Sequence, residues 1–224
     1  MTEKVKLAEL VKDFNLYPRS MIDGQHVRDM VRSLQAGHIL PPIVVDRASK
    51  RIVDGWHRHS AYVRFLGDGG EVDVDLQDYV DEDAIFLDAV TRNAEHGKKF
   101  SSHDRARCVA LAEARGIDYG RMADVLHVKV EVVKEIHTTK VAYVTITEEP
   151  IALKRPMRVW AGTTITDEQV EANRRSGGMT PLFCANQLIL FLGADVVDCN
   201  HEPTIAGLRI LQGKLAEFLT SVEG

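Results

Sequence analysis

Hydrophobic and polar positions follow two different periods along the first hundred residues. Apolar residues recur at helical spacing at Val27, Met30 and Leu34, whereas the apolar run Pro41 to Val45 has the length of a strand. Residues 51–53 form another short apolar run across a polar turn. Alternating strand and helix signals predict a mixed α/β or α+β unit rather than a helical bundle.

Capping residues indicate where the helices begin and end. The segment Ser20–Asp23 has the spacing of a capping box, and Gly37 stands where a glycine stop belongs. The segment Ser101–Asp104 repeats the capping-box spacing, and Gly116 follows it as a stop. We therefore expect one helix between each pair of signals.

An acidic segment follows at residues 71–83. Seven of its thirteen residues are Asp or Glu, and Val72, Val74, Leu76 and Tyr79 alternate with them. This alternation predicts an exposed or edge strand with a solvated face.

The rest of the chain is dominated by helical patterns. We expect three short helices with tight connections between residues 101 and 139, preceded by a helix over 84–95. Their outline is that of a helix-turn-helix unit. The turn-rich stretch Thr145 to Arg158 is the most natural domain boundary, and two further helices are expected over 181–192 and 204–222.

Composition narrows the classes of function. The 224 residues carry a net charge of −5, which excludes a surface covered in basic residues, so any contact with nucleic acid must be local. We find no leader peptide, and the most apolar stretch, Leu188 to Val197, is shorter than the roughly 18 residues of a membrane span. We expect a cytoplasmic protein without membrane contact. The three cysteines support neither a disulfide framework nor a zinc knuckle.

Several common catalytic motifs are absent from the sequence. The Gly207 to Lys214 segment has the wrong spacing for a Walker loop, and Leu215 stands where Ser or Thr is needed. Neither a GxSxG elbow nor an HExxH motif occurs. His57 and His59 are two residues apart at a helix start, so they point in different directions and are poor partners for one metal ion.

The best candidate site is the glycine turn Asp54–His59, which leads from an expected strand into a helical pattern. Backbone N–H groups at the start of a helix favour anions. Gly55 allows the backbone to approach a ligand, Arg58 can fork onto phosphate oxygens, and His57 can donate to them or move a proton. A purely structural role for this turn stays open.

Two basic segments are candidates for DNA contact. Lys154, Arg155 and Arg158 precede Arg174 and Arg175 in a strip that also contains Trp160, and an aromatic ring can stack on a base. The last of the three short helices carries Lys129 and Lys134 but also two glutamates, so DNA contact and simple packing both remain open for it. For the strip, a solvated face remains the alternative.

Five sequence pieces together resemble the ParB/sulfiredoxin-like superfamily. Four lie in the first 61 residues, and the fifth is the segment Arg92–Gly97 with the helix that follows it. The resemblance covers about residues 4–140. The first four pieces are Tyr17–Arg19, Val31–Gly37, Pro42–Val45 and Ile52–Ala61.

The resemblance implies a small mixed domain that binds a nucleoside triphosphate, ATP or CTP, over residues 1–98. A helix-turn-helix-like region over 99–145 and a C-terminal helical extension over 146–224 would follow, giving an α+β chain overall. Members of this family often form homodimers. The residues implied at the phosphates are Arg19, Ser20, Gly55, His57, Arg58 and Asn93. Asn93 resembles the position that approaches the phosphates or a magnesium ion, and Glu95 could substitute for the glutamate that the family places before this asparagine.

The sequence also departs from its relatives. ParB proteins that use CTP carry Gly-Glu-Arg-Arg in the turn, whereas Trp56 and His57 stand here in place of the Glu and the first Arg. Trp56 also replaces the cysteine that sulfiredoxin chemistry requires. The Asp-Gly-x-His-Arg form is closer to members that use ATP or ADP, including small-molecule kinases. Arg92 occupies the usual place of a Glu next to Asn93.

Three hypotheses follow. The first is a nucleotide-regulated DNA-binding protein. The second is an enzyme of the same fold, such as an NTPase, a kinase-like phosphotransferase or a nuclease, in which Asp54, His57 or Glu95 acts as the base. The third is a scaffold that binds partners and has lost its site.

Overall fold

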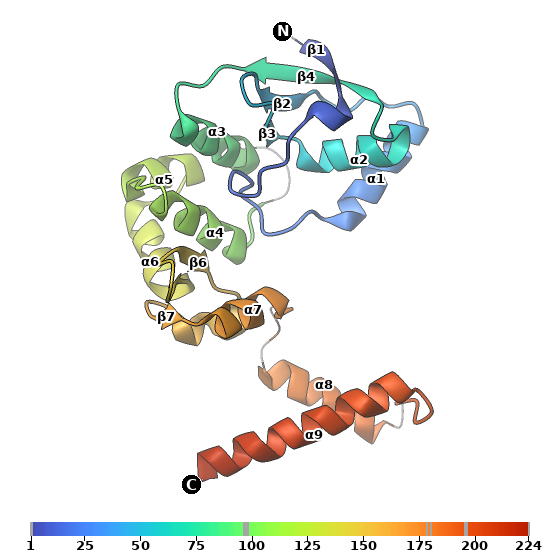
Figure 1. The fold of residues 1–224 in the computed structure, drawn as a ribbon, viewed down its shortest axis with the longest axis vertical. Helices are drawn as coiled ribbons and strands as arrows, with labels where there is room; N and C mark the ends of the chain where they lie inside the picture. The colour runs from blue at the N-terminus through green and yellow to red at the C-terminus, as the bar shows by residue number, and fades with distance from the viewer. Residues whose placement is uncertain (1, 96–98, 178, 180, 195–196, 224) are drawn as a thin grey trace. The chain divides into compact units, whose positions relative to one another are not determined.

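The computed structural model describes residues 2–95, 99–177, 179, 181–194 and 197–223. Residues 1–177 form one compact unit and residues 178–224 form a second (Figure 1). The first unit contains two sheets and seven α-helices within its described residues, and the second contains two α-helices within its own.

The larger sheet has four strands. Its outer pairs are antiparallel, and its two central strands run parallel to each other. A short 3-10 helix, Leu7–Glu9, follows the first strand. In their order across the sheet the strands are β1 (Thr2–Lys6), β4 (Glu71–Gln77), β2 (Ile43–Asp46) and β3 (Ile52–Asp54).

The position of β4 corrects the expectation of an edge strand. It lies between β1 and β2, and the side chains of Val72, Val74 and Leu76 are buried. The acidic residues between them lie on the other face, where Asp73 forms an ion pair of 3.0 Å with Lys4 of β1. The alternation of apolar and acidic residues therefore correctly predicted a strand. The prediction of an edge position was wrong, because the strand with the acidic face lies inside the sheet.

Helices α1 (Gly24–Gln35) and α2 (Trp56–Leu66) pack against each other beside this sheet (Figure 1). The expected start of α1 is corrected, because its N-cap is Asp23, whose carboxylate accepts hydrogen bonds from the backbone N–H groups of the first turn. Ser20 lies before the helix and has another partner, described below.

Four further helices continue the same core: α3 (Glu82–Glu95), α4 (Ser102–Glu113), α5 (Tyr119–Leu126) and α6 (Val130–Lys140). The capping box at the start of α4 is confirmed, since the side chains of Ser101 and Asp104 each accept a hydrogen bond from the other's backbone N–H. One hydrophobic cluster runs without a break from the larger sheet through α3 to α6. It includes Val53, Phe86, Met122 and Val133.

A second, three-stranded sheet follows α6 and was not predicted. The expected boundary at residues 145–158 contains one of its strands and most of a 3-10 helix, η2 (Arg155–Trp160), and helix α7 (Asp167–Arg175) follows. The predicted α+β class is confirmed. The strands of this sheet are β6 (Pro150–Ala152), β5 (Val141–Val144) and β7 (Thr164–Ile165).

The second unit consists of α8 (Pro181–Gly193) and α9 (Glu202–Glu223), close to the two helices expected there. Among the described residues, no helix combines the length and the apolar character needed to cross a membrane.

Candidate functional site

A cavity of about 850 Å³ lies between the loop before α1, the turn from β3 into α2, and the end of α3. Small-molecule sites in proteins usually measure about 300 to 1,000 Å³. The cavity therefore has room for a nucleotide-sized ligand. The six residues expected at the phosphates all line it: Arg19, Ser20, Gly55, His57, Arg58 and Asn93.

Gly55 forms the turn at which α2 begins. Its φ of 110° is a conformation that side chains rarely adopt, and a Cβ here would lie 3.1 Å from the guanidinium of Arg58. As the N-cap, Gly55 offers no side chain to the N–H groups of the first turn. The positive end of α2 is thus left without a side-chain cap at the wall of the cavity, an arrangement that favours an anion.

The Arg58 guanidinium is largely engaged within the chain. It donates to the carbonyl oxygens of Pro41 and Pro42 and forms an ion pair of 2.5 Å with Asp54. Its side chain is only 14% exposed. Arg58 therefore fixes the glycine turn in this arrangement, and the Asp54 carboxylate is occupied by a cation rather than free to act as a base.

His57 connects α2 to the start of α1. Its Nε2 atom accepts a hydrogen bond of 3.0 Å from the backbone N–H of Asp23, and the ring of His26 lies 5.2 Å away. Burial, with smaller contributions from His26 and Arg19, lowers the pKa of His57 to about 4. The imidazole is therefore neutral near pH 7, and the bond to Nε2 places its proton on Nδ1, which leaves one N–H to donate to a ligand.

Arg19 and Asn93 come together from positions far apart in the sequence. The Arg19 Nε atom donates to Oδ1 of Asn93 at 3.0 Å, and its guanidinium lies 5.0 Å from the centre of the Phe100 ring. Arg19 is 9% exposed. The contact brings a buried cation to the cavity, and it also occupies the Asn93 oxygen that a metal ion would need.

Ser20 links the cavity loop to α4. Its backbone N–H and its hydroxyl donate to the Asp104 carboxylate at 2.8 and 2.9 Å. Burial alone would raise the pKa of Asp104, but the hydrogen bonds from Ser20 and Ser101 hold that pKa below its usual value. Asp104 therefore stays ionised while it holds the loop to the helix.

Two more residues of α4 and one residue just after it hold the same loop. Arg107 donates to the carbonyl oxygens of Phe14 and Tyr17, and the Cys108 thiol donates to that of Pro18. Arg115, just after α4, donates to the carbonyl oxygen of residue 15. The wall of the cavity is consequently attached to the first of the three consecutive helices.

An aromatic pair forms another part of the cavity lining. The rings of Tyr17 and Trp56 are stacked with centroids 4.2 Å apart, and the exposed Phe14 packs edge-on against Trp56. The Trp56 side chain donates to the carbonyl oxygen of Ile52 and is 2% exposed. Trp56, which stands where ParB proteins and sulfiredoxins carry other residues, therefore serves as a rigid support beneath the glycine turn.

Glu95 does not line the cavity. Its carboxylate lies 3.7 Å from Nε2 of His127. Within the described residues, no group of three or more His, Cys, Asp or Glu side chains is arranged to hold a metal ion. Asn93 and Glu95 therefore do not fit a magnesium site in this arrangement. Part of the motif that contains them, residues 96–97, lies outside the described residues.

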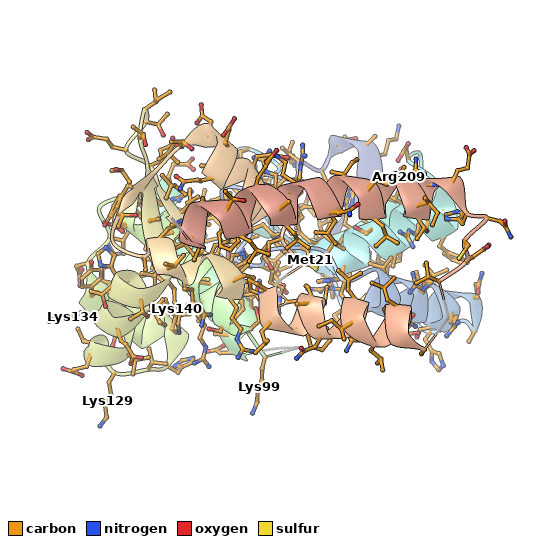
Figure 2. All side chains as sticks on the ribbon, turned by 90° about the horizontal axis from the view of Figure 1, so that it is seen from below. Met21, Lys99, Lys129, Lys134, Lys140 and Arg209 are labelled. Carbon is orange, nitrogen blue, oxygen red and sulfur yellow. The ribbon has the colours of Figure 1, made fainter. Side chains whose placement is uncertain are left out.

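Sequence reasoning missed three basic residues that line the cavity: His26, Arg92 and Lys99. Arg92 is paired with Asp88 at 2.7 Å, whereas Lys99 is exposed and makes no ion pair with another described residue. Figure 2 shows the Lys99 side chain extending away from the ribbon. Its position just before the second capping box was the available signal.

The candidates for DNA contact differ in how freely they can reach a phosphate. Lys129 and Lys134, at the start and in the middle of α6, are exposed, and Figure 2 shows both at the periphery of the ribbon. Arg155 is also exposed. None of these three makes an ion pair with another described residue, so their charges are available.

The other basic residues of the strip have partners within the chain. The Lys154 ammonium donates to the carbonyl oxygens of Arg174 and Ser176, each at 2.5 Å. Arg158 donates to the Ser102 hydroxyl at 3.0 Å. Arg174 and Arg175 are both paired with Glu171.

Comparison with known proteins finds no family model that matches the chain. A curated relative, the transcriptional regulator NovG of Streptomyces niveus, is 34% identical over 108 residues. The match covers 48% of this chain and spans about a third of NovG, at 32% of its length.

Among solved structures, the chain is similar to the chromosome-partitioning protein ParB of Caulobacter crescentus in two complexes. For the complex with CTP-γ-S, the TM-score is 0.38 at 15% identity, covering 61% of this chain and 76% of ParB. For the complex with the centromeric parS site, the TM-score is 0.42 at 17% identity, covering 60% and 69%. NovG and these two ParB complexes are proteins to which this chain is similar.

Proposed function

We propose that this protein binds a nucleoside triphosphate, ATP or CTP, in the cavity at the glycine turn and that the bound nucleotide controls its binding to DNA. The observation that carries the proposal is the uncapped start of α2 at Gly55, which faces a nucleotide-sized cavity. The motif resemblance to ParB supports the same assignment.

The phosphates would lie at the N-terminal end of α2, where the backbone N–H groups and the helix dipole favour negative charge. The His57 Nδ1–H and the buried Arg19 would add donors from two sides. Lys99 is exposed and could turn toward the phosphates. Tyr17 and Trp56 would offer an apolar wall to the nucleoside.

A bound nucleotide would influence DNA binding through the loop before α1, which α4 holds in place. Arg19 and Ser20 line the cavity, and Ser20 is bonded to Asp104 of α4. A ligand that draws Ser20 toward its phosphates would compete with that bond. The balance between the two sets of contacts would couple the cavity to α4 and to the helices packed on it.

DNA contact would fall to Lys129, Lys134 and Arg155, which are exposed and have no ion-pair partner among the described residues. Lys154 and Arg158 would first have to release their own acceptors within the chain. The acidic net charge of the chain requires such contacts to be local.

An enzymatic role for the same fold is the alternative, and it needs a base beside the phosphates. Asp54 is paired with Arg58, and Nε2 of His57 is occupied by the N–H of Asp23. Both groups would have to exchange partners before accepting a proton. For that reason we place regulated binding first and make nucleotide turnover an outcome to be measured.

The two glycines that cap α2 provide a matched test of the cavity. Gly55→Ala and Gly67→Ala both place a Cβ on a residue with positive φ, at opposite ends of the same helix, but only Gly55 borders the cavity. Each substitution should cost about 1–3 kcal/mol of stability because of the positive φ, and Gly55→Ala also crowds the Arg58 guanidinium. Only Gly55→Ala should abolish calorimetric binding of ATP or CTP. Equal binding by both variants, or no binding by the wild type, would contradict the proposal, and product analysis of the same samples would reveal turnover.

A further inference from the structure

Arg92, in the last turn of α3, is held at the wall of the cavity through only one of its side-chain nitrogens. Its Nε atom donates to Oδ2 of Asp88, four residues earlier, at 2.7 Å. The hydroxyl of Tyr79 donates to the same oxygen at 2.6 Å, so the carboxylate that anchors the guanidinium is itself fixed. The two terminal nitrogens of Arg92 donate to no other described residue. Their N–H groups are therefore available to a ligand in the cavity.

The charge of Arg92 is maintained at this position. Its side chain is 32% exposed, so it is partly shielded from water. Burial alone would lower the pKa of Arg92, but the bond to Asp88 and the negative charges around it raise that pKa above its usual value. Asp54, directly before Gly55, is one of these charges. The guanidinium is therefore positive and lies within electrostatic range of the N-terminal end of α2, the proposed phosphate position.

Three carboxylates line the same cavity among the described residues, and each is already engaged within the chain. Both oxygens of Asp104 accept hydrogen bonds from serine residues. Asp54 is paired with Arg58, and Asp23 accepts from the N–H groups of the first turn of α1. Mg²⁺ at nucleotide sites is usually bound through one or two carboxylates together with phosphate oxygens. These carboxylates serve the fold instead.

Cations reach the cavity from other segments as well. Arg19 lies in the loop before α1, and Lys99 lies shortly before α4. Asn93, next to Arg92, accepts from Arg19 through its Oδ1 atom at 3.0 Å. The cavity therefore supplies positive charge from side chains of its own, whereas the oxygens that a metal ion would need are bonded inside the chain.

We propose that the cavity binds the nucleoside triphosphate without a metal ion, and that Arg92 contacts the phosphates and neutralises them in place of Mg²⁺. This inference rests on the function proposed above. A guanidinium can donate to two phosphate oxygens at once and stays charged throughout the physiological pH range. The presence of Arg92 in the usual place of a glutamate agrees with this account, because a cation there replaces a possible metal ligand.

The effect of magnesium on affinity separates this mode of binding from the usual one. The protein and free Mg²⁺ would compete for the same phosphate oxygens. A protein that binds the metal complex of a nucleotide gains affinity when Mg²⁺ is added, whereas this chain should gain none.

Calorimetric titration of the full chain with ATP and with CTP, in EDTA and in excess Mg²⁺ at equal ionic strength, tests the inference. Affinity in EDTA should equal or exceed affinity with Mg²⁺. Arg92→Gln should weaken binding in EDTA about tenfold or more, because it removes a contact between two charged groups. Arg175→Gln is the matched control and should bind as the wild type does. Arg175 also forms a 2.7 Å ion pair with a carboxylate four residues earlier, in the last turn of α7, but does not line the cavity.

Wild-type binding that is weaker in EDTA than with Mg²⁺ would overturn the inference and leave the proposed function standing. Equal affinities for Arg92→Gln and Arg175→Gln would also overturn it, because Arg92 would then make no contact with the phosphates. Absence of binding under both conditions would contradict the proposed function itself. Thermal melting would establish that both variants fold, and the magnesium comparison needs only the wild-type chain.

Discussion

The cavity and the strip of residues 154–175 both contain several basic residues and one tryptophan, yet the structure uses them differently. Around the cavity, Arg19, His57 and Lys99 line one space beside an uncapped helix start. In the strip, Lys154 and Arg158 donate to acceptors of the chain itself. A count of positive charges in a sequence therefore says little about binding until the acceptors nearby are known.

Replacing each of the two tryptophans by alanine tests this comparison, and of the predictions made here it has the largest expected effect on stability. Trp56 is stacked on Tyr17 and almost fully buried, whereas Trp160 is only partly buried at the edge of the smaller cluster. Trp56→Ala should lower the free energy of unfolding by about 3–5 kcal/mol. Trp160→Ala should lower it by about 1 kcal/mol. Urea denaturation measures both, and equal losses would mean that the cavity is no better supported than the strip.

The salt dependence of DNA binding separates free basic residues from engaged ones. Each phosphate contact contributes about 0.9 to the slope of log K against log salt. Lys129→Ala combined with Lys134→Ala should reduce the slope by about 2. Lys154→Ala combined with Arg158→Ala is the control and should leave it unchanged. If Lys154→Ala combined with Arg158→Ala reduces the slope more, the DNA contact lies in the strip of residues 154–175 instead.

Lys99 tests the cationic side of the cavity. Lys99→Ala removes an exposed charge without breaking an ion pair among the described residues, so stability should not change. Affinity for a nucleoside triphosphate should fall about three- to tenfold, as expected for the loss of one hydrogen bond worth about 0.5–1.5 kcal/mol. Lys6→Ala, on β1 outside the cavity, is the calorimetric control. Equal affinities for the two variants would remove Lys99 from the site.

The pH dependence of stability tests the neutral state of His57. The pKa of His57 is about 4 in the folded chain and about 6.5 when unfolded, so between these values the unfolded state binds more protons. The contribution of His57 is therefore fully present above pH 6.5 and is lost as the pH falls toward 4. His57→Gln should make the decline in melting temperature shallower in this window. Parallel curves for the two proteins would mean that His57 is not held neutral.

Much of the fold could be predicted from local signals. The capping box at Ser101 and the spacing of apolar residues predicted most helices and strands of the first 140 residues. Their predicted bounds are close to the observed ones. The small second sheet was missed because its strands have only two to four residues, too few for alternation to show. The start of α1 was misplaced because Ser20 has a tertiary partner, Asp104, that is 84 residues away.

The candidate site was predictable as a location but not in its internal bonding. The glycine turn and the six expected phosphate residues do surround one cavity. The sequence could not reveal that Arg58 is bonded to Pro41, Pro42 and Asp54, because those contacts depend on how β2, β3 and α2 meet. The approach of Arg19 to Asn93 depends in the same way on how the loop before α1 meets α3.

Regulated binding is tested most directly by measuring the affinity for labelled duplex DNA with and without saturating nucleotide. The account predicts that ATP or CTP changes the dissociation constant by about fivefold or more, the usual range of coupling between two sites. Gly55→Ala should bind DNA with an affinity that nucleotide does not alter. Identical affinities with and without nucleotide, for a wild-type protein shown by calorimetry to be saturated, would contradict the account.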